Sequence, residues 1–511
     1  MISKLFKRIL SQTFIVAFLL IAQILLIIAV LLKIKGSAIM SLILNVLSII
    51  VVLHIIGRKE NPTFKMAWIV PIMLFPLFGG LFFLLIQMQK LTKSYKKRLD
   101  SSYEITAPYI AQRTEVLKDI EKADNNQLDF AYYMNNYGGY PISENTETTY
   151  LPTGEKKWTA MINELKKAKR YIFLEYFIIK EGTMWNSVLE ILKEKVTQGV
   201  DVRVIYDGVG SGSVLPYKYF RKLEQFGIKA KVFSPFVPFL SVLQNNRDHR
   251  KICVVDGISA ICGGINIGDE YINVEERFGH WKDSSVLLRG DAAYTFAIMF
   301  LQMWLLSGSE ESNFESFRPL PCESDKFKCD GFSAPYGDCP LDDETVGKFV
   351  YLDIINNAKK YVYITTPYLI LDNEMTTSLC FASKRGVDVR IILPKIPDKW
   401  YAYSVAISHF EELISSGIKI YKYTPGFIHS KTFVADDEIS VVGSINLDFR
   451  SLYLHYECAV WMFKTKSVIE VFDDFTETLK VSTPVTLEDC TKIGSLHRML
   501  NAVLRLFAPM M

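Results

Sequence analysis

Three long apolar runs open the chain, at residues 13–32, 38–56 and 66–88, and none of them contains a charged residue. An α-helix rises 1.5 Å per residue, so about twenty such residues cross the ~30 Å hydrocarbon core of a bilayer. Pro71 and Pro76 predict a kink in the third run, because membrane helices tolerate proline. A cleaved signal peptide is the alternative for the first run, but the run is too long and no small-residue cleavage site follows it. The pattern therefore predicts a multi-pass membrane anchor in the first hundred residues.

A polar segment at residues 101–149 follows, and we expect it to be a linker. Beyond it, short apolar strands alternate with helices in a pattern that occurs twice. The repeated segments are 168–176, 185–197 and 199–205 in the first copy, and 358–366, 374–384 and 386–392 in the second. Each copy is typical of strand, helix and strand in an α/β fold with buried sheets. We expect two homologous α/β halves, 150–320 and 321–511, packed about a pseudo-twofold axis.

The residues that can carry chemistry repeat with the fold. The motif His-x-Lys-x4-Asp occurs twice, 180 residues apart, and an asparagine follows each histidine after 17 residues. The candidate site residues are His249, Lys251, Asp256 and Asn266 in the first copy, and His429, Lys431, Asp436, Ser444 and Asn446 in the second. A single His-x-Lys is more often an ordinary surface or core pair. Two matched copies in two similar halves indicate a catalytic site.

Strand geometry separates the roles within each motif. Side chains at i and i+2 of a strand share a face, so each histidine and its lysine point the same way. The aspartate, seven residues after the histidine, points to the other face and begins a turn, where a short carboxylate bonds local backbone. We therefore expect Asp256 and Asp436 to fix the strand ends, while the histidines and lysines meet the substrate.

Two histidines, two lysines and two asparagines that converge on one point suit a phosphate diester. Lysines and amides donate to the nonbridging oxygens, one imidazole attacks phosphorus, and the other protonates the leaving alkoxide. No cofactor or metal is expected, because the sequence lacks the carboxylate clusters of two-metal phosphodiesterases. Imidazoles need orienting partners, and the candidates are Asp283 for His249 and Glu457 for His429, which lie 34 and 28 residues after their histidines; the alternative for each is an ordinary surface acid.

The tandem motif resembles that of the phospholipase D superfamily, and within it the chain is similar to the bacterial cardiolipin synthases. The second resemblance rests on runs in the anchor and in both halves. These are Asn61-Pro62, Pro76-Leu77-Phe78-Gly79, Gly263-Gly264-Ile265-Asn266-Ile267-Gly268-Asp269-Glu270-Tyr271 and Gly443-Ser444-Ile445-Asn446-Leu447-Asp448-Phe449-Arg450-Ser451. The run at 13–32 departs from the family, since it looks like a span beyond the usual pair.

The resemblance implies transfer of a phosphatidyl group from one phosphatidylglycerol to another, giving cardiolipin and glycerol. One histidine would form a phosphatidyl-histidine, and the other would act as acid and then as base. By analogy His249 is the nucleophile, although the two copies match too closely for the sequence to decide. The implied partners are phosphatidylglycerol and membrane lipid, and the implied location is the cell membrane.

Charge is divided unevenly along the chain. The first 100 residues hold thirteen lysines and arginines against two acids, which leaves 45 basic and 53 acidic residues beyond them. The net negative charge beyond residue 100 disfavours a nuclease, because binding of a nucleic-acid backbone needs many lysines and arginines. The two intact motifs disfavour an inactive scaffold. A hydrolytic phospholipase D, or a transferase with another alcohol acceptor, is the remaining alternative.

Loop charges bear on orientation. Three spans would divide the loop cations six against seven, which decides nothing by itself. The densest cluster, residues 90–98, directly follows the third run and tips the expectation toward a cytoplasmic catalytic part.

Overall fold

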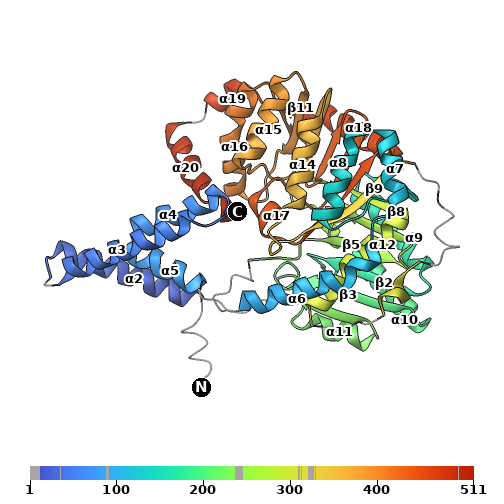
Figure 1. Ribbon diagram of the computed structural model, residues 1–511, viewed down its shortest axis with the longest axis horizontal. Helices are drawn as coiled ribbons and strands as arrows, with labels where there is room; N and C mark the ends of the chain where they lie inside the picture. The colour runs from blue at the N-terminus through green and yellow to red at the C-terminus, as the bar shows by residue number, and fades with distance from the viewer. Residues whose placement is uncertain are drawn as a thin grey trace. The chain divides into compact units, whose positions relative to one another are not determined.

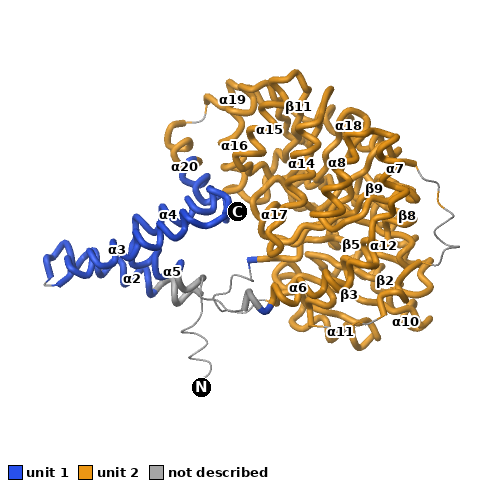
Figure 2. The backbone as a smooth tube through the Cα atoms, in the orientation of Figure 1, with its two compact units in different colours: residues 1–94, 236–245, 502–511 blue, residues 95–235, 246–501 orange. Residues whose placement is uncertain are grey.

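The computed structural model describes residues 12–34, 36–87, 91–235, 245–308, 311, 313–319, 327, 330–492 and 494–510. The chain divides into two compact units (Figure 2). Residues 1–94, 236–245 and 502–511 form the anchor unit, and residues 95–235 and 246–501 form the α/β unit.

Four helices lie wholly within the anchor unit: α2 (Gln12–Leu31), α3 (Ser37–Ile56), α4 (Pro62–Leu74) and α5 (Pro76–Gln87). Gln23 Oε1 accepts the N–H groups of Leu77 at 2.9 Å and Phe78 at 3.3 Å. These donors lie in the first turn of α5, where a helix has no partners for them. The amide of Gln23 therefore fixes the start of α5 against α2.

The third apolar run forms two helices, where the sequence predicted one kinked span. α4 ends before Phe75, whose φ of −131° and ψ of 75° are not helical, and Pro76 begins α5. Gly79 permits the close approach of the two helices, because a Cβ there would lie 2.6 Å from Ile72 Cα. Helices of 13 and 12 residues are roughly 20 Å long, too short for a bilayer core of ~30 Å.

Among the residues that the structure describes, α3 is the one helix long and apolar enough to cross a membrane. It leaves apolar side chains such as Leu42 and Ile50 exposed, as a helix in contact with lipid would. The segment Phe18–Leu31 of α2 and the whole of α4 are shorter apolar helical segments.

Residues 101–149, expected to be a linker, are largely helical. They include the end of α6 (Leu91–Thr106), α7 (Thr114–Ala123) and α8 (Asn126–Tyr133). Val116 and Ile120, one turn apart on α7, are buried, and so is Phe130, whose ring lies 4.7 Å from that of Trp461. The segment is part of the core of the α/β unit. Its polar outer faces mask this amphipathic pattern in the sequence.

Two sheets form the centre of the α/β unit (Figure 1). The strands of the first are β1 (Thr146–Leu151), β2 (Tyr171–Tyr176), β3 (Asp201–Asp207), β4 (Lys229–Phe233), β5 (Lys251–Val255), β6 (Ser259–Gly263) and β8 (Ser285–Gly290). Those of the second are β9 (Phe332–Asp338), β10 (Tyr361–Thr365), β11 (Asp388–Pro394), β12 (Lys419–Tyr423), β14 (Thr432–Ala435), β15 (Ile439–Gly443), β16 (Glu457–Phe463) and β17 (Ser482–Pro484).

The two sheets share one topology. The first has the order β1-β8-β6-β5-β2-β3-β4, and the second has β9-β16-β15-β14-β10-β11-β12-β17, so only β17 lacks a counterpart. The helices α10 (Thr183–Thr197) and α15 (Asn373–Lys384) connect the parallel strands. α12 (Asp291–Leu306) packs on its own sheet and on β9, while α18 (Lys466–Lys480) packs on its own sheet and on β1. Each half thus contributes a helix to the other.

The motif aspartates fix the strand ends, as expected. The carboxylate of Asp256 accepts the backbone N–H groups of residues 169–171, each at 2.8 Å, at the start of β2. Asp436 accepts those of residues 359–361 at 2.6 to 2.9 Å, at the start of β10. Both aspartates have positive φ, 54° and 56°, in the turn after their strands. This is a conformation that aspartate adopts more readily than most residues.

The substitution Asp256→Ala is expected to destabilise the α/β unit. It leaves three backbone donors without their carboxylate and places alanine at positive φ, at a cost of about 2–4 kcal/mol. Thermal unfolding of the purified full chain should shift down by roughly 4–10 °C. Asp256→Asn should shift it less, because its Oδ1 still accepts. An Asp256→Ala protein with unchanged unfolding but lost turnover would contradict a structural role.

Candidate active site

The motif histidines lie at the edge of each sheet where its first parallel strand ends. β2 ends where β5 begins, with Tyr176 paired to Lys251, and His249 precedes that lysine by two residues. In the second half β10 ends where β14 begins, and His429 lies just before β14. Both histidines are only 8% exposed. The sheet register therefore brings each motif to an equivalent position.

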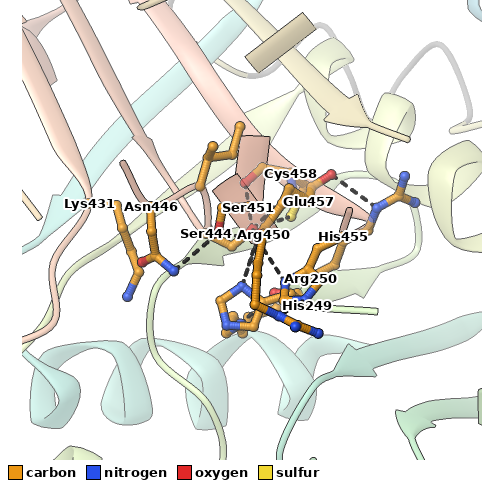
Figure 3. Close-up of polar contacts among 12 residues, drawn as sticks. His249, Arg250, Lys431, Ser444, Asn446, Arg450, Ser451, His455, Glu457 and Cys458 are labelled. Carbon is orange, nitrogen blue, oxygen red and sulfur yellow. Dashed lines mark hydrogen bonds and ion pairs between the residues drawn. The ribbon is translucent and has the colours of Figure 1, made fainter. Parts of the chain in front are cut away.

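Each histidine is oriented by a carboxylate from the other half. His249 Nδ1 lies 2.9 and 3.0 Å from the two oxygens of Glu457, the first residue of β16 (Figure 3). His429 Nδ1 lies 2.7 Å from Asp283 Oδ2, just after β7 (His280–Lys282). The backbone N–H of each histidine also donates to the backbone carbonyl of the residue before that acid: His249 to Tyr456 at 2.9 Å, and His429 to Lys282 at 2.7 Å. The two predicted acids are thus placed beside the histidines, with the partners exchanged between halves.

These contacts set the protonation of the imidazoles. A carboxylate accepts, so each Nδ1 carries a proton and each Nε2 keeps a lone pair. Burial, helped by the charges of Lys251 and Lys431, holds the pKa of His249 well below its usual value. Burial and Lys431 lower the pKa of His429 to about 4, although Asp283 opposes this. Both imidazoles are therefore neutral at pH 7, as a nitrogen nucleophile must be.

The motif lysines bring positive charge to the same place. Each Nζ donates to the carbonyl of its own motif histidine. Burial lowers the pKa of Lys251 to about 8 and that of Lys431 to about 7, and the charge of Lys251 adds to the shift of Lys431. A bound anion would offset the free-energy cost of burying these cations and reduce their mutual repulsion.

The asparagines hold neighbouring groups in place. Asn266 Oδ1 accepts the N–H of Ile178 at 3.0 Å, and its Nδ2 donates to the hydroxyl of Tyr271 at 2.8 Å. Asn446 Nδ2 donates to Ser451 Oγ at 3.1 Å. Direct donation from these amides to a phosphate stays a prediction.

Glu457 accepts from two serines in addition to the histidine (Figure 3). Ser444 Oγ, already a candidate, donates to Oε2, and Ser451 Oγ donates to Oε1 at 2.7 Å. The sequence reasoning missed Ser451 as a site residue. Its position, five residues after Asn446 as Tyr271 is after Asn266, is the signal that could have found it.

One group among the described residues has metal-ligand spacing. His249, His455 and Glu457 each bring a ligand atom within 4.8 Å of the others. Glu457 already accepts from His249 and two serines, and His455 Nε2 accepts from Arg450 Nε at 3.2 Å. Hydrogen bonds thus use most of the atoms that a metal would bind, so we describe the group as a hydrogen-bonded network.

The surroundings of the two histidines differ. Three aromatic rings lie near His429: those of Tyr271, Trp281 and Phe427, with centroids at 5.9, 5.4 and 5.7 Å from that of the imidazole. His249 instead has the ring of Phe177 at 5.0 Å and that of His455 at 5.6 Å. One side of the site is therefore aromatic and the other is more polar.

Comparisons with known proteins agree with this geometry. The family described as "Cardiolipin synthase, PLD-like domain" matches residues 161–304 and 351–479, and "Phospholipase_D-nuclease N-terminal" matches residues 46–87. An uncharacterised protein of Streptococcus mutans is 44% identical, covering 90% of this chain and 99% of that protein. A cardiolipin synthase of Halalkalibacterium halodurans is 31% identical, covering 92% and 93%.

A solved structure supports the fold. The phosphatidylserine synthase of Haemophilus influenzae superposes with a TM-score of 0.55 at 13% identity, covering 74% of this chain and 99% of its own. The family match includes both motifs and most of both sheets. The chain therefore belongs to the cardiolipin synthase family, phosphatidyltransferases of the phospholipase D type.

Proposed function

We propose that the protein transfers the phosphatidyl group of one phosphatidylglycerol to a hydroxyl of a second, giving cardiolipin and glycerol. The observation that carries this proposal is the pair of nearly buried imidazoles, each oriented by a carboxylate of the opposite half. Such a pair supplies a nucleophile and a proton-transfer group to one phosphate diester. The family supports a phospholipid substrate, and phosphatidylglycerol is the lipid that we propose.

In the first step, Nε2 of His249 attacks phosphorus, and the bond from phosphorus to the oxygen of the headgroup glycerol breaks. His429, which takes up a proton from solvent at Nε2 when the diester binds, gives that proton to the leaving oxygen, and the phosphatidyl group remains on His249. The negative charge of the bound diester raises the pKa of His429 from about 4, which allows it to carry that proton. Lys251 and Lys431 donate to the nonbridging oxygens, where charge increases.

In the second step, the acceptor lipid replaces the released glycerol. His429, now neutral, takes the proton of the acceptor hydroxyl, and the oxygen attacks phosphorus. The bond from phosphorus to His249 breaks, which restores the free imidazole. Over the two steps one phosphodiester bond is broken and one is formed, so the reaction is reversible.

The aromatic side of the site favours a lipid alcohol over water. Trp281 and Phe427 lie beside His429, the group that takes the proton from the acceptor. Apolar rings at that position limit the entry of water, which would hydrolyse the intermediate. A hydrolytic phospholipase D is the alternative, and it would release phosphatidic acid in place of cardiolipin.

Loss of either histidine should abolish the transfer. His249→Ala and His429→Ala are each expected to lower cardiolipin formation by at least about 10³-fold, because the two groups act as a unit. Mass analysis of the lipids formed from phosphatidylglycerol measures this, and His497→Ala, an exposed histidine of α20 (Ser495–Leu506), is the control. Thermal unfolding near that of the parent shows that the variants fold. Parental activity in either catalytic variant would refute the two-histidine mechanism.

We also propose that α2 and α3 both cross the bilayer and that the catalytic part is cytoplasmic. Each helix has 20 residues, most of them apolar, whereas α4 and α5 are too short. With two spans, only Lys33 and Lys35 fall between them in the sequence, and the other eleven cations of the first hundred residues would be on the opposite side of the membrane. Positive charge collects on the cytoplasmic side. With three spans, the thirteen lysines and arginines of the first hundred residues divide six against seven across the membrane. With two spans, eleven are on the cytoplasmic side and two are on the other.

Cysteine labelling tests this topology. In intact bacteria, a membrane-impermeant maleimide should label Lys33→Cys, between α2 and α3, and should spare Lys59→Cys, between α3 and α4. After lysis both should react. Labelling of Lys59→Cys in intact cells would overturn the orientation, and the parent chain corrects for native cysteines.

A further inference from the structure

Two loops, one in each half, leave the sheets at the edge where the histidines lie. β3 runs parallel to β2 and ends beside it, and β11 runs parallel to β10 and ends beside it. β2 and β10 are the strands whose ends adjoin the motif histidines. We define the rim loops as residues 208–218, after β3, and residues 395–400, after β11 and into the start of α16 (Trp400–Ser415).

The rim loops expose large apolar side chains to solvent. Tyr217 is 90% exposed, the highest value for such a side chain among the described residues, and Trp400 is 64% exposed. Val209, Val214 and Ile396 are exposed as well. Single exposed apolar residues are ordinary, but five on two loops beside one site indicate an interaction surface.

Lysines accompany these aromatic rings. Lys218 Nζ lies 5.0 Å from the centroid of the Tyr217 ring, and Lys399 directly precedes Trp400. The rim loops contain a single acid, Asp398, and its carboxylate accepts a tyrosine hydroxyl at 2.6 Å. Tyrosine or tryptophan beside lysine is the combination found at the boundary between lipid and water.

Both rim loops adjoin the catalytic groups. Asp207, the last residue of β3, forms an ion pair at 2.8 Å with Arg247, two residues before His249. Lys399 is close enough that its charge, after burial and the charges nearer the ring, contributes to the low pKa of His249. A surface that binds the rim loops therefore lies next to the catalytic groups.

We propose that the rim loops dock on the surface of an anionic phospholipid bilayer, with Tyr217 and Trp400 at the headgroup level and Lys218 and Lys399 on lipid phosphates. The inference rests on the proposed function, because a lipid substrate has to bring its phosphate from the bilayer to the histidines. Phosphatidylglycerol is itself anionic, so the substrate membrane complements the lysines. The anchor keeps the enzyme at the membrane, and the rim loops turn the site toward it.

Fluorescence quenching tests the docking without turnover. The full chain, labelled with a fluorophore at Tyr217→Cys or Trp400→Cys, is reconstituted in vesicles of phosphatidylglycerol and phosphatidylcholine that contain a brominated lipid. The matched control is Phe381→Cys, because Phe381 is 58% exposed on α15, and the parent chain corrects for native cysteines. Bromine should quench both rim positions several-fold more than position 381. Quenching at the rim no greater than at position 381 would overturn the proposal.

Activity provides the second arm of the test. The double variant Tyr217→Ser and Trp400→Ser should lower the ratio of cardiolipin formed from vesicle lipid to that formed from monomeric dihexanoyl phosphatidylglycerol by about tenfold. Phe381→Ser should leave this ratio at the parental value. A parental ratio in the double variant would contradict docking. A parent chain that makes no cardiolipin from either lipid form would refute the proposed function, while quenching would still decide the docking.

Discussion

The hydrogen bonds from His249 to Glu457 and from His429 to Asp283 hold the two halves in one working arrangement, because each joins a histidine of one half to an acid of the other. Neither half contains both members of a histidine–carboxylate pair, so the site requires both halves. A backbone hydrogen bond beside each pair, from the histidine N–H to the residue before the acid, fixes how the two segments align. α12 and α18, which each pack on both halves, support it from the core.

The shared topology does not make the two sides of the site equivalent. His429 has Trp281 and Phe427 beside it, whereas His249 has His455 and the hydroxyls around Glu457. The polar network holds the carboxylate of the proposed nucleophile in place. The aromatic rings limit water where the acceptor must lose its proton. Two copies of one fold can therefore perform two parts of one reaction.

Much of the site follows from the sequence, because its spacing is local. The repeated His-x-Lys-x4-Asp motif placed both histidines and lysines, and strand parity gave the anchoring role of Asp256. The exchange of Asp283 and Glu457 between halves could not be predicted, since no local pattern encodes a contact between residues about 150 to 200 apart in the chain. Ser451 was missed for a similar reason, because its role depends on the folded position of Glu457.

The fold was predicted less completely where polarity hid packing. The α/β repeats of both halves follow from their strand and helix periods, and both sheets have them. The segment 101–149 looks like a linker because only a narrow face of α7, with Val116 and Ile120, is apolar. The third apolar run looks like one span because hydropathy does not register that the chain leaves the helix at Phe75.

The exchanged pairing is tested most directly by burst kinetics with a phosphatidyl ester of 4-nitrophenol, whose leaving group needs no acid. The burst of nitrophenolate then reports attack by His249 alone, and the later steady rate reports release through His429. The account predicts that Glu457→Gln slows the burst by at least about tenfold, whereas Asp283→Asn keeps a burst near the parental rate and slows the steady turnover. The reverse pattern, with the burst lost in Asp283→Asn and kept in Glu457→Gln, would contradict it.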